Sequence, residues 1–248
     1  MKHGDWVERY RRGEREAVWS ELRLLGSAVR DPLLLEEAQA VCDQMALRAR
    51  FNIEMLVERL TSQGFLFHSN DDQRIPVCPF QPANPAARRL VTWLEAEFGP
   101  IPLALSSWIR LVGDVWLVGT HPEWSESSEA DPLVIELEGS RHPEASIAGF
   151  FASEYEAWEE AATDDPSNGS FILPVAPDRL HKANVSGSDP YGFRLPDGGI
   201  DGLFVAETEM PFVSYLNLVF RNGGFPARAP GSEQVRIRKA LSEGLLAL

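Results

Sequence analysis

The sequence predicts an α+β fold, in which an N-terminal helical segment precedes a mixed, mostly antiparallel sheet flanked by helices. Helical spacing of apolar residues dominates residues 1–67, and a proline-rich stretch over 68–85 then separates them from the rest. Beyond it, helical patterns alternate with short apolar runs bounded by turn residues, which is typical of α+β domains. The 248 residues are 44% hydrophobic and 24% charged, enough for a sizeable core.

The helical segment opens with apolar residues at helical spacing over 14–29. Asp31 and Pro32 then supply an N-cap and a first-turn proline for a second helix. From there apolar residues follow steps of three, four or seven as far as Gly64, which is a candidate C-cap. The pattern predicts about 30 residues of amphipathic helix, whereas most globular helices have ~8–20. It therefore fits one long helix, two shorter helices or a helix that forms a dimer.

The stretch 68–85 is predicted to be an extended linker or a wrapping arm, because proline at this density blocks both helices and central strands. Its prolines are Pro76, Pro79, Pro82 and Pro85. We therefore divide the chain into a helical N-terminal segment, this connector, an α+β domain and a C-terminal tail with a short helix, at residues 1–67, 68–85, 86–226 and 227–248.

Helical and strand patterns alternate in the predicted α+β domain. Trp93 and Leu94 belong to a helical apolar face that Gly99 and Pro100 end. Short runs rich in Val, Ile, Leu and Phe between turn residues predict strands. We expect helices over 86–98, 102–112 and 211–220, and strands over 115–118, 133–137, 171–175, 191–196 and 203–205. Residues 153–162 fit an acidic helix or a strand–helix junction before one.

The negative charge is concentrated in one part of the chain. The sequence has 23 Lys and Arg against 37 Asp and Glu, a net charge of −14. Residues 121–170 contain 13 of these acids and Arg141 as the one basic residue, a net charge of −12. This distribution argues against a nucleic-acid binder, which needs clustered Lys and Arg facing phosphates.

Aromatic residues are interleaved with these acids, and the segment has three interpretations. The first is a solvated face with an acidic loop. The second is a recognition surface that steers a basic protein toward it and anchors that protein through aromatic side chains. The third is metal binding, for which the sequence lacks a calcium loop or a His-Glu-x-x-His helix. The candidate partner-binding residues are Trp124, Glu154, Tyr155, Glu156, Trp158, Glu159 and Glu160.

A second candidate site is the polar stretch 178–191 between two predicted strands. His181 with Asp178 or Asp189 would form an acid–base pair there, and the neighbouring cations would bind a small anion. The alternative is a long loop whose Asn, Ser and Asp side chains cap its own backbone. The candidate ligand residues are His181, Lys182, Asn184 and Asp189.

The sequence contains no motif for a cofactor, a metal or covalent catalysis. A Gly-x-Ser-x-Gly elbow, a phosphate-binding loop and a His pair at metal-ligand spacing are all missing. Cys42 and Cys78 lack a basic setting and are expected to be inert thiols. We expect no catalytic residue, no cofactor and no metal. The polar start and the lack of an apolar run near ~20 residues predict a cytoplasmic protein without a membrane partner.

Two segments resemble a known family. Trp93–Gly113 contains the end of an amphipathic helix, a Gly, an Ile-Pro pair, a second helix and a Gly before a strand. Pro211–Leu216 is similar to a closing helix. Over residues 86–226 the chain thus resembles the SUKH superfamily, although the acidic insert departs from its pattern. The resemblance implies an immunity protein, which neutralises a toxin domain, often a nuclease, by protein–protein contact without catalysis.

Together these observations favour a non-enzymatic protein-binding module. Its acidic, aromatic-containing surface would engage a basic protein, such as a toxin or nuclease, and the opposite charges would speed association. Two alternatives stay open. One is a scaffolding protein that forms a homodimer through a helix over 32–63, and the other is an enzyme with a pocket around 178–191 and His181 as its general base.

Overall fold

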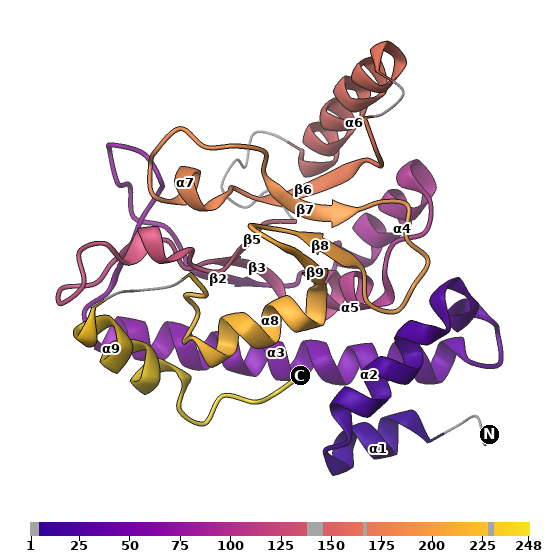
Figure 1. Ribbon diagram of the computed structural model, residues 1–248, viewed down its shortest axis with the longest axis horizontal. Helices are drawn as coiled ribbons and strands as arrows, with labels where there is room; N and C mark the ends of the chain where they lie inside the picture. The colour runs from indigo at the N-terminus through magenta and orange to yellow at the C-terminus, as the bar shows by residue number, and fades with distance from the viewer. Residues whose placement is uncertain (1–4, 138–145, 166–167, 228–230) are drawn as a thin grey trace.

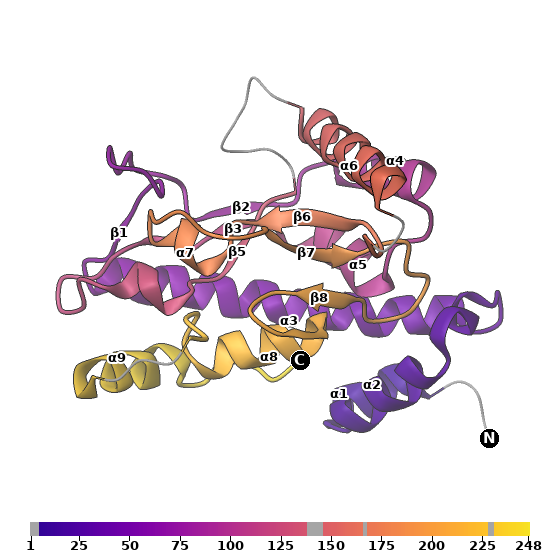
Figure 2. The same cartoon turned by 45° about the horizontal axis from the view of Figure 1, so that its top comes forward.

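The computed structural model describes residues 5–137, 146–165, 168–227 and 231–248 (Figure 1). Helices and antiparallel strands follow one another as an α+β fold with an N-terminal helical segment, which confirms the predicted fold class. The strands of the described residues form three small sheets, and helices lie on both sides of them (Figure 2).

The helical segment consists of α1 (Trp6–Arg12), α2 (Arg15–Leu24), the 3-10 helix η1 (Gly26–Arg30) and α3 (Leu35–Ser62). The helix predicted over 14–29 is therefore α2 followed by η1. Helix α3 is continuous over 28 residues, so the interpretation as one long helix is correct. It runs along the length of the molecule beneath the sheets (Figure 2).

Helix α3 is long because most of its circumference has a packing partner. Its buried side chains recur at steps of three and four and pack against α5 (Leu103–Leu111). Of its large apolar side chains, Leu47 and Phe51 are exposed. The core is continuous from Trp6 in α1 to Leu248 at the end of the chain.

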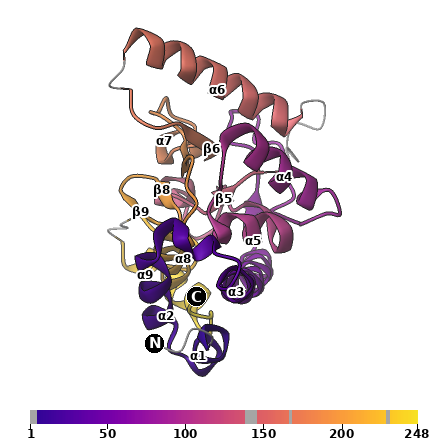
Figure 3. The ribbon, with the colours of Figure 1, turned by 90° about the vertical axis from the view of Figure 1, so that its right-hand side faces the viewer.

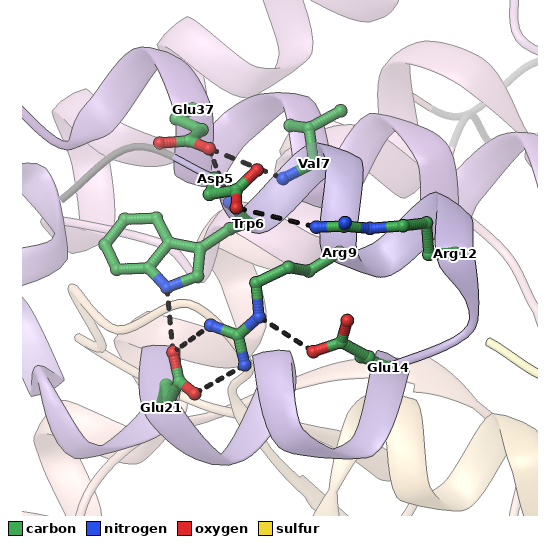
Figure 4. Close-up of polar contacts among 8 residues, drawn as sticks. All are labelled: Asp5, Trp6, Val7, Arg9, Arg12, Glu14, Glu21 and Glu37. Carbon is green, nitrogen blue, oxygen red and sulfur yellow. Dashed lines mark hydrogen bonds and ion pairs between the residues drawn. The ribbon is translucent and has the colours of Figure 1, made fainter. Parts of the chain in front are cut away.

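A polar network ties α1 to α2 and α3 (Figure 4). The Arg9 guanidinium donates two hydrogen bonds of 2.7 Å to the Glu21 carboxylate. The first backbone N–H groups of a helix have no acceptor within it. In α1 those of Trp6 and Val7 donate to the Glu37 carboxylate. A side chain of α3 therefore caps the first helix.

All named strands pair antiparallel. The sheets are β1–β4, β2–β3–β5 and β6–β7–β8–β9. Their strands are β1 (Leu66–Phe67), β2 (Phe80–Pro82), β3 (Gly113–Trp116), β4 (Gly119–Thr120), β5 (Val134–Ile135), β6 (Ile172–Ala176), β7 (Tyr191–Arg194), β8 (Leu203–Val205) and β9 (Glu209–Pro211). A backbone hydrogen bond of 2.8 Å from Glu136 to Val175 joins the second sheet to the third.

The proline-rich stretch is a wrapping arm rather than a free linker. Its one strand, β2, pairs with β3, and Trp116 donates its indole N–H to the His68 carbonyl over 2.9 Å. The two segments approach so closely that Gly113 has no room for a side chain, since a Cβ there would lie 2.2 Å from the Gln81 carbonyl oxygen. Gly113 also has a φ of 102°, which favours glycine.

The remaining helices are α4 (Ala87–Phe98), α5, α6 (Ile147–Asp164), α7 (Arg179–Lys182), α8 (Phe212–Arg221) and α9 (Ser232–Ser242), with a 3-10 turn η2 (Ser127–Ala130). An aromatic cluster joins α8 to the third sheet, because Phe212 lies 4.8 Å from Phe193 and 5.6 Å from Phe204 between ring centroids. Helix α6 lies at the side of the sheets remote from α1, α2 and α3 (Figures 1 and 3).

A buried histidine makes stability depend on pH near neutrality. The Nδ1 of His121 accepts the backbone N–H of Glu123 over 3.1 Å, so its Nε2 carries the proton and donates to Gln63 over 3.0 Å. Burial lowers the pKa of His121, the Arg236 charge lowers it further, and the Glu123 charge opposes both. The unfolded chain therefore binds a proton more readily than the folded one.

We expect acidification from pH 7.5 to 5.5 to lower the free energy of unfolding through this group. The loss begins near the unfolded His pKa of about 6.5 and ends below the lower folded value. Urea unfolding at the two pH values measures it, and His121→Gln, which keeps a donor and an acceptor but does not titrate, is the control. An equal fall in both proteins would contradict the assignment.

Candidate functional site

Helix α6 carries an exposed group of carboxylates, which we call the acidic face. Side chains four residues apart lie on the same side of a helix. Glu156, Glu160 and Asp164 therefore form an outward ridge, with Glu154 and Glu159 on its flanks, and all five residues are exposed. The helix contains no Lys, Arg or His. Four of the five were predicted partner-binding residues, and the structure brings them together.

The aromatic side chains of α6 hold the helix to the protein. Phe151 is fully buried, and Tyr155 and Trp158 are half-buried. The Tyr155 ring lies 5.0 Å from that of Phe171 and 5.1 Å from that of Phe98, and the Trp158 ring lies 5.9 Å from that of Phe171. Two of the three predicted aromatic anchors, Tyr155 and Trp158, are therefore partly buried against Phe171 beside β6, and Tyr155 also packs against α4.

Two residues outside the prediction extend the acidic face. Phe150 lies within α6 and is 45% exposed, so it offers an apolar ring beside the carboxylates. Glu97, exposed at the end of α4, is close enough for its charge to raise the pKa of Tyr155 on α6. The pKa of Tyr155 is raised by burial first, then by the charge of Glu159 and a hydrogen bond to it, and then by Glu97. The negative field therefore continues from α6 onto α4.

Repulsion among the carboxylates of the acidic face destabilises helix α6. Like charges three or four residues apart cost about 0.2–0.5 kcal/mol per pair, and α6 places Glu156 four residues before Glu160 and Glu160 four before Asp164. A carboxylate in the last turn also opposes the helix dipole. Among the ion pairs of the described residues, none contains a carboxylate of the acidic face.

Trp124 does not belong to this surface, contrary to its predicted role. It is 5% exposed and packs between the Phe225 ring, 5.2 Å away, and the Arg238 guanidinium. Glu123 beside it pairs with Arg236 of α9. The acidic segment therefore divides in two, since the chain passes through β5 between η2 and α6 (Figure 1). Glu138 and Glu144 lie outside the described residues.

The 178–191 stretch is organised by a capped turn of helix, α7. The Asp178 carboxylate accepts the backbone N–H groups of Leu180 and His181, as an N-cap does, and it also bonds to Nδ1 of His181. Burial acts to raise the pKa of Asp178, but these hydrogen bonds outweigh burial and lower it. His181 is about half exposed. The Asp178 carboxylate of the predicted acid–base pair therefore also caps the backbone of α7.

Lys182 points away from solvent into an ion pair. Its Nζ donates to Oδ1 of Asp131 over 2.6 Å and lies 4.6 Å from the centre of the Tyr191 ring. The side chains of Lys182 and Asp131 are 0% and 6% exposed. Burial lowers the pKa of Lys182, and the Asp131 charge and hydrogen bond oppose this. Lys182 therefore forms a buried ion pair, and its ammonium group is not exposed to a ligand in solution.

The other two predicted ligand residues lie elsewhere on the loop. The Asn184 side chain donates to Asp72 over 2.7 Å, and Asp189 is exposed. Asn70 donates to the His181 carbonyl over 2.9 Å, so the wrapping arm fastens the loop. Asp178 caps the backbone of the stretch as the alternative interpretation expects, whereas Asn184 bonds to the wrapping arm instead.

Sequence reasoning missed the polar groups that Lys182 meets. Asp131 is 51 residues away in sequence, and Tyr191 begins β7. The Tyr191 hydroxyl lies 3.5 Å from Oδ2 of Asp131, and Tyr215 of α8 is buried nearby. Asp131 has a left-handed backbone, with a φ of 58°, and is 4% exposed. Asp131 and Tyr215 line one cavity of about 170 Å³.

Within the ranges that the structure describes, no three His, Cys, Asp or Glu side chains are grouped to hold a metal ion. Nor does any helix of those ranges have the length and apolarity to cross a membrane.

The chain matches no protein-family model, no curated protein and no solved structure.

Proposed function

We propose that this chain is a protein-binding module of the immunity type, whose acidic face on α6 captures a basic partner. One observation carries the proposal. Helix α6 presents five exposed carboxylates without a basic residue and without an ion pair among the described residues, although their repulsion costs helix stability. A partner rich in Lys and Arg supplies the missing counter-charges.

The chemistry of the surface fits a protein partner. Phe150 gives an exposed apolar ring beside the carboxylates, which is the combination of aromatic anchor and polar rim that protein interfaces use. Glu97 widens the negative field on the α4 side. A toxin nuclease has a basic groove for phosphates, so a row of carboxylates is complementary to that groove.

The SUKH-type resemblance gives independent support to the same proposal. The segments that carry it fold as α4, α5, β3 and α8. Helix α6 lies between β3 and α8 in the chain, after β5 and before β6. We propose that this helix gives this chain its partner specificity.

Charge reversal of the acidic face tests the proposal. With Glu154, Glu156, Glu159 and Glu160 changed to Lys, association with the partner is expected to slow about 100-fold at low ionic strength, because electrostatic steering contributes 10–10³ to the rate. The measurement is surface plasmon resonance at 20 mM and 500 mM salt. Its ligands are the purified products of the genes adjacent to the one that encodes this chain.

A matched control carries the same charge change elsewhere. Glu8, Glu16, Glu36 and Glu58 are exposed on α1, α2 and α3, and no ion pair of the described residues contains them. Their change to Lys alters the net charge equally and is expected to slow association less than threefold. If both variants slow association equally, net charge and not α6 is responsible. If no adjacent gene product binds the wild-type chain, the immunity proposal fails.

A further inference from the structure

A cavity of about 170 Å³ lies between α8, the turn from β8 to β9 and Asp131. Its polar lining includes Asp131, Glu207 and Tyr215, and its apolar lining includes Met210, Leu218 and Pro226. An apolar cavity of about 150 Å³ accommodates benzene, so this one has room for a ligand of about six non-hydrogen atoms. It lies apart from α6, since no described residue of its lining belongs to that helix.

The hydroxyl of Tyr215 is an unsatisfied polar group in this lining. Tyr215 is 2% exposed, and its Oη has no hydrogen-bond partner among the described residues. A buried hydroxyl without a partner costs about 1–3 kcal/mol, and such groups are rare in folded proteins. Burial raises the pKa of Tyr215, and the charge of Asp131 raises it further. The two polar groups therefore lie within electrostatic range of each other.

Asp131 also has spare capacity to accept hydrogen bonds. A carboxylate offers about four acceptor positions. Oδ1 accepts Lys182, while Oδ2 has only the Tyr191 hydroxyl at 3.5 Å, the limit of a hydrogen bond, among the described residues. A donor in the cavity would meet this oxygen.

The acceptors of the lining suit a cation. Among the described residues that line the cavity, Asp131 and Glu207 are acidic and none is basic, although Glu207 also pairs with Arg179 over 2.8 Å. Lys182, which pairs with Asp131, is not among the described residues of the lining. A metal ion would need more ligands than the described residues group together. An ammonium group instead needs a few acceptors, and the apolar lining suits an aliphatic chain.

We propose that this cavity binds a primary ammonium group on a short aliphatic chain, carried by a free amine or by a lysine side chain. The ammonium donates to Oδ2 of Asp131 and to Oη of Tyr215. The site is separate from the acidic face, so its failure would leave the proposed function untouched.

Nuclear magnetic resonance titration of the whole chain with butylammonium chloride tests the proposal, with sodium chloride matching the ionic strength. We expect saturable amide shifts around 206–210 with a dissociation constant on the order of 1 mM, as befits a ligand of this size. Butanol, the neutral compound of the same length, is expected to bind at least tenfold more weakly. Equal binding of butanol, or no binding of butylammonium at 50 mM, overturns the proposal.

Two variants locate the site. Tyr215→Phe removes only the unpaired hydroxyl and is expected to weaken binding about tenfold or more. Tyr10→Phe removes the other buried tyrosine hydroxyl without a partner, far away in α1, and is expected to change nothing. Leu218→Trp at the 39% exposed edge fills the cavity and should abolish binding. Unchanged affinity in both cavity variants overturns the site.

A blocked lysine, N-acetyl-lysine methylamide, separates the two sources of the ammonium group. If it binds as tightly as butylammonium, with the same dependence on Tyr215, the site takes a lysine side chain of a protein. If only butylammonium binds, the site takes a free amine. Both results support the cavity as an ammonium site, whereas binding of either probe that Tyr215→Phe and Leu218→Trp leave unchanged contradicts it.

Discussion

Replacement of Asp131 by Ala is expected to lower the free energy of unfolding by about 3–5 kcal/mol, because it leaves a buried charge without its partner. The Lys182 side chain is fully buried, and Asp131 is its hydrogen-bond acceptor at 2.6 Å. The cation–π contact between Lys182 and the Tyr191 ring, whose centre is 4.6 Å from Nζ, compensates only part of the lost stabilisation. Domains of this kind are stable by about 5–15 kcal/mol, so the variant keeps a much smaller margin.

A double variant separates the charge from the packing. Asp131→Ala with Lys182→Met removes both charges while keeping most of the Lys182 volume, and it is expected to recover at least half of the loss. The midpoint of urea unfolding, at an unchanged m-value, measures the loss of stability in the single and the double variant. A single variant within 1 kcal/mol of wild type, or a double variant no more stable than the single one, would contradict the buried-pair account.

Replacement of Asp201 by Ala is expected to cost about 3 kcal/mol. Its carboxylate is 0% exposed, Oδ2 accepts two hydrogen bonds from Arg23 of α2, and Oδ1 accepts the backbone N–H of Val213 over 3.0 Å. That N–H is in the first turn of α8, where a helix lacks an acceptor of its own. One side chain thus ties the N-terminal helices to the last helix of the sheet domain.

The neutral analogue tests which of the two contacts matters. Asp201→Asn keeps an oxygen for Val213 and removes the charge that faces Arg23. Arg23 is 30% exposed, so water compensates part of its loss. We expect a cost of about 1–2 kcal/mol for Asn, measured by urea unfolding as before. If Asn costs as much as Ala, the ion pair dominates, and the capping explanation is wrong.

The sequence was most informative where local chemistry decides the structure. Gly99 and Pro100 end α4 where predicted, and the periodicity of apolar residues predicted a long helix over 32–63, of which Leu35–Ser62 forms α3. The short strands β1 and β4 have two residues each, too few for an alternating pattern to show. Within 133–137, which was predicted to be a strand, only Val134–Ile135 forms one.

The candidate sites depend on contacts between distant residues, which periodicity does not reveal. The carboxylates of α6 were predictable, because their spacing follows from the helix. The burial of Trp124 was not, since it depends on Phe225 and Arg238 from the end of the chain. The Asp131–Lys182 pair likewise forms only when α7 packs against η2. A lysine in a polar loop gives no signal that it is buried.

Amide hydrogen exchange on the complex with the basic partner is the most direct measurement of where this chain binds. We predict slower exchange over residues 147–164 of α6 and at the end of α4 on complex formation, with α1 and α2 unchanged. Protection confined to other elements, with α6 exchanging as it does in the free protein, would contradict the account.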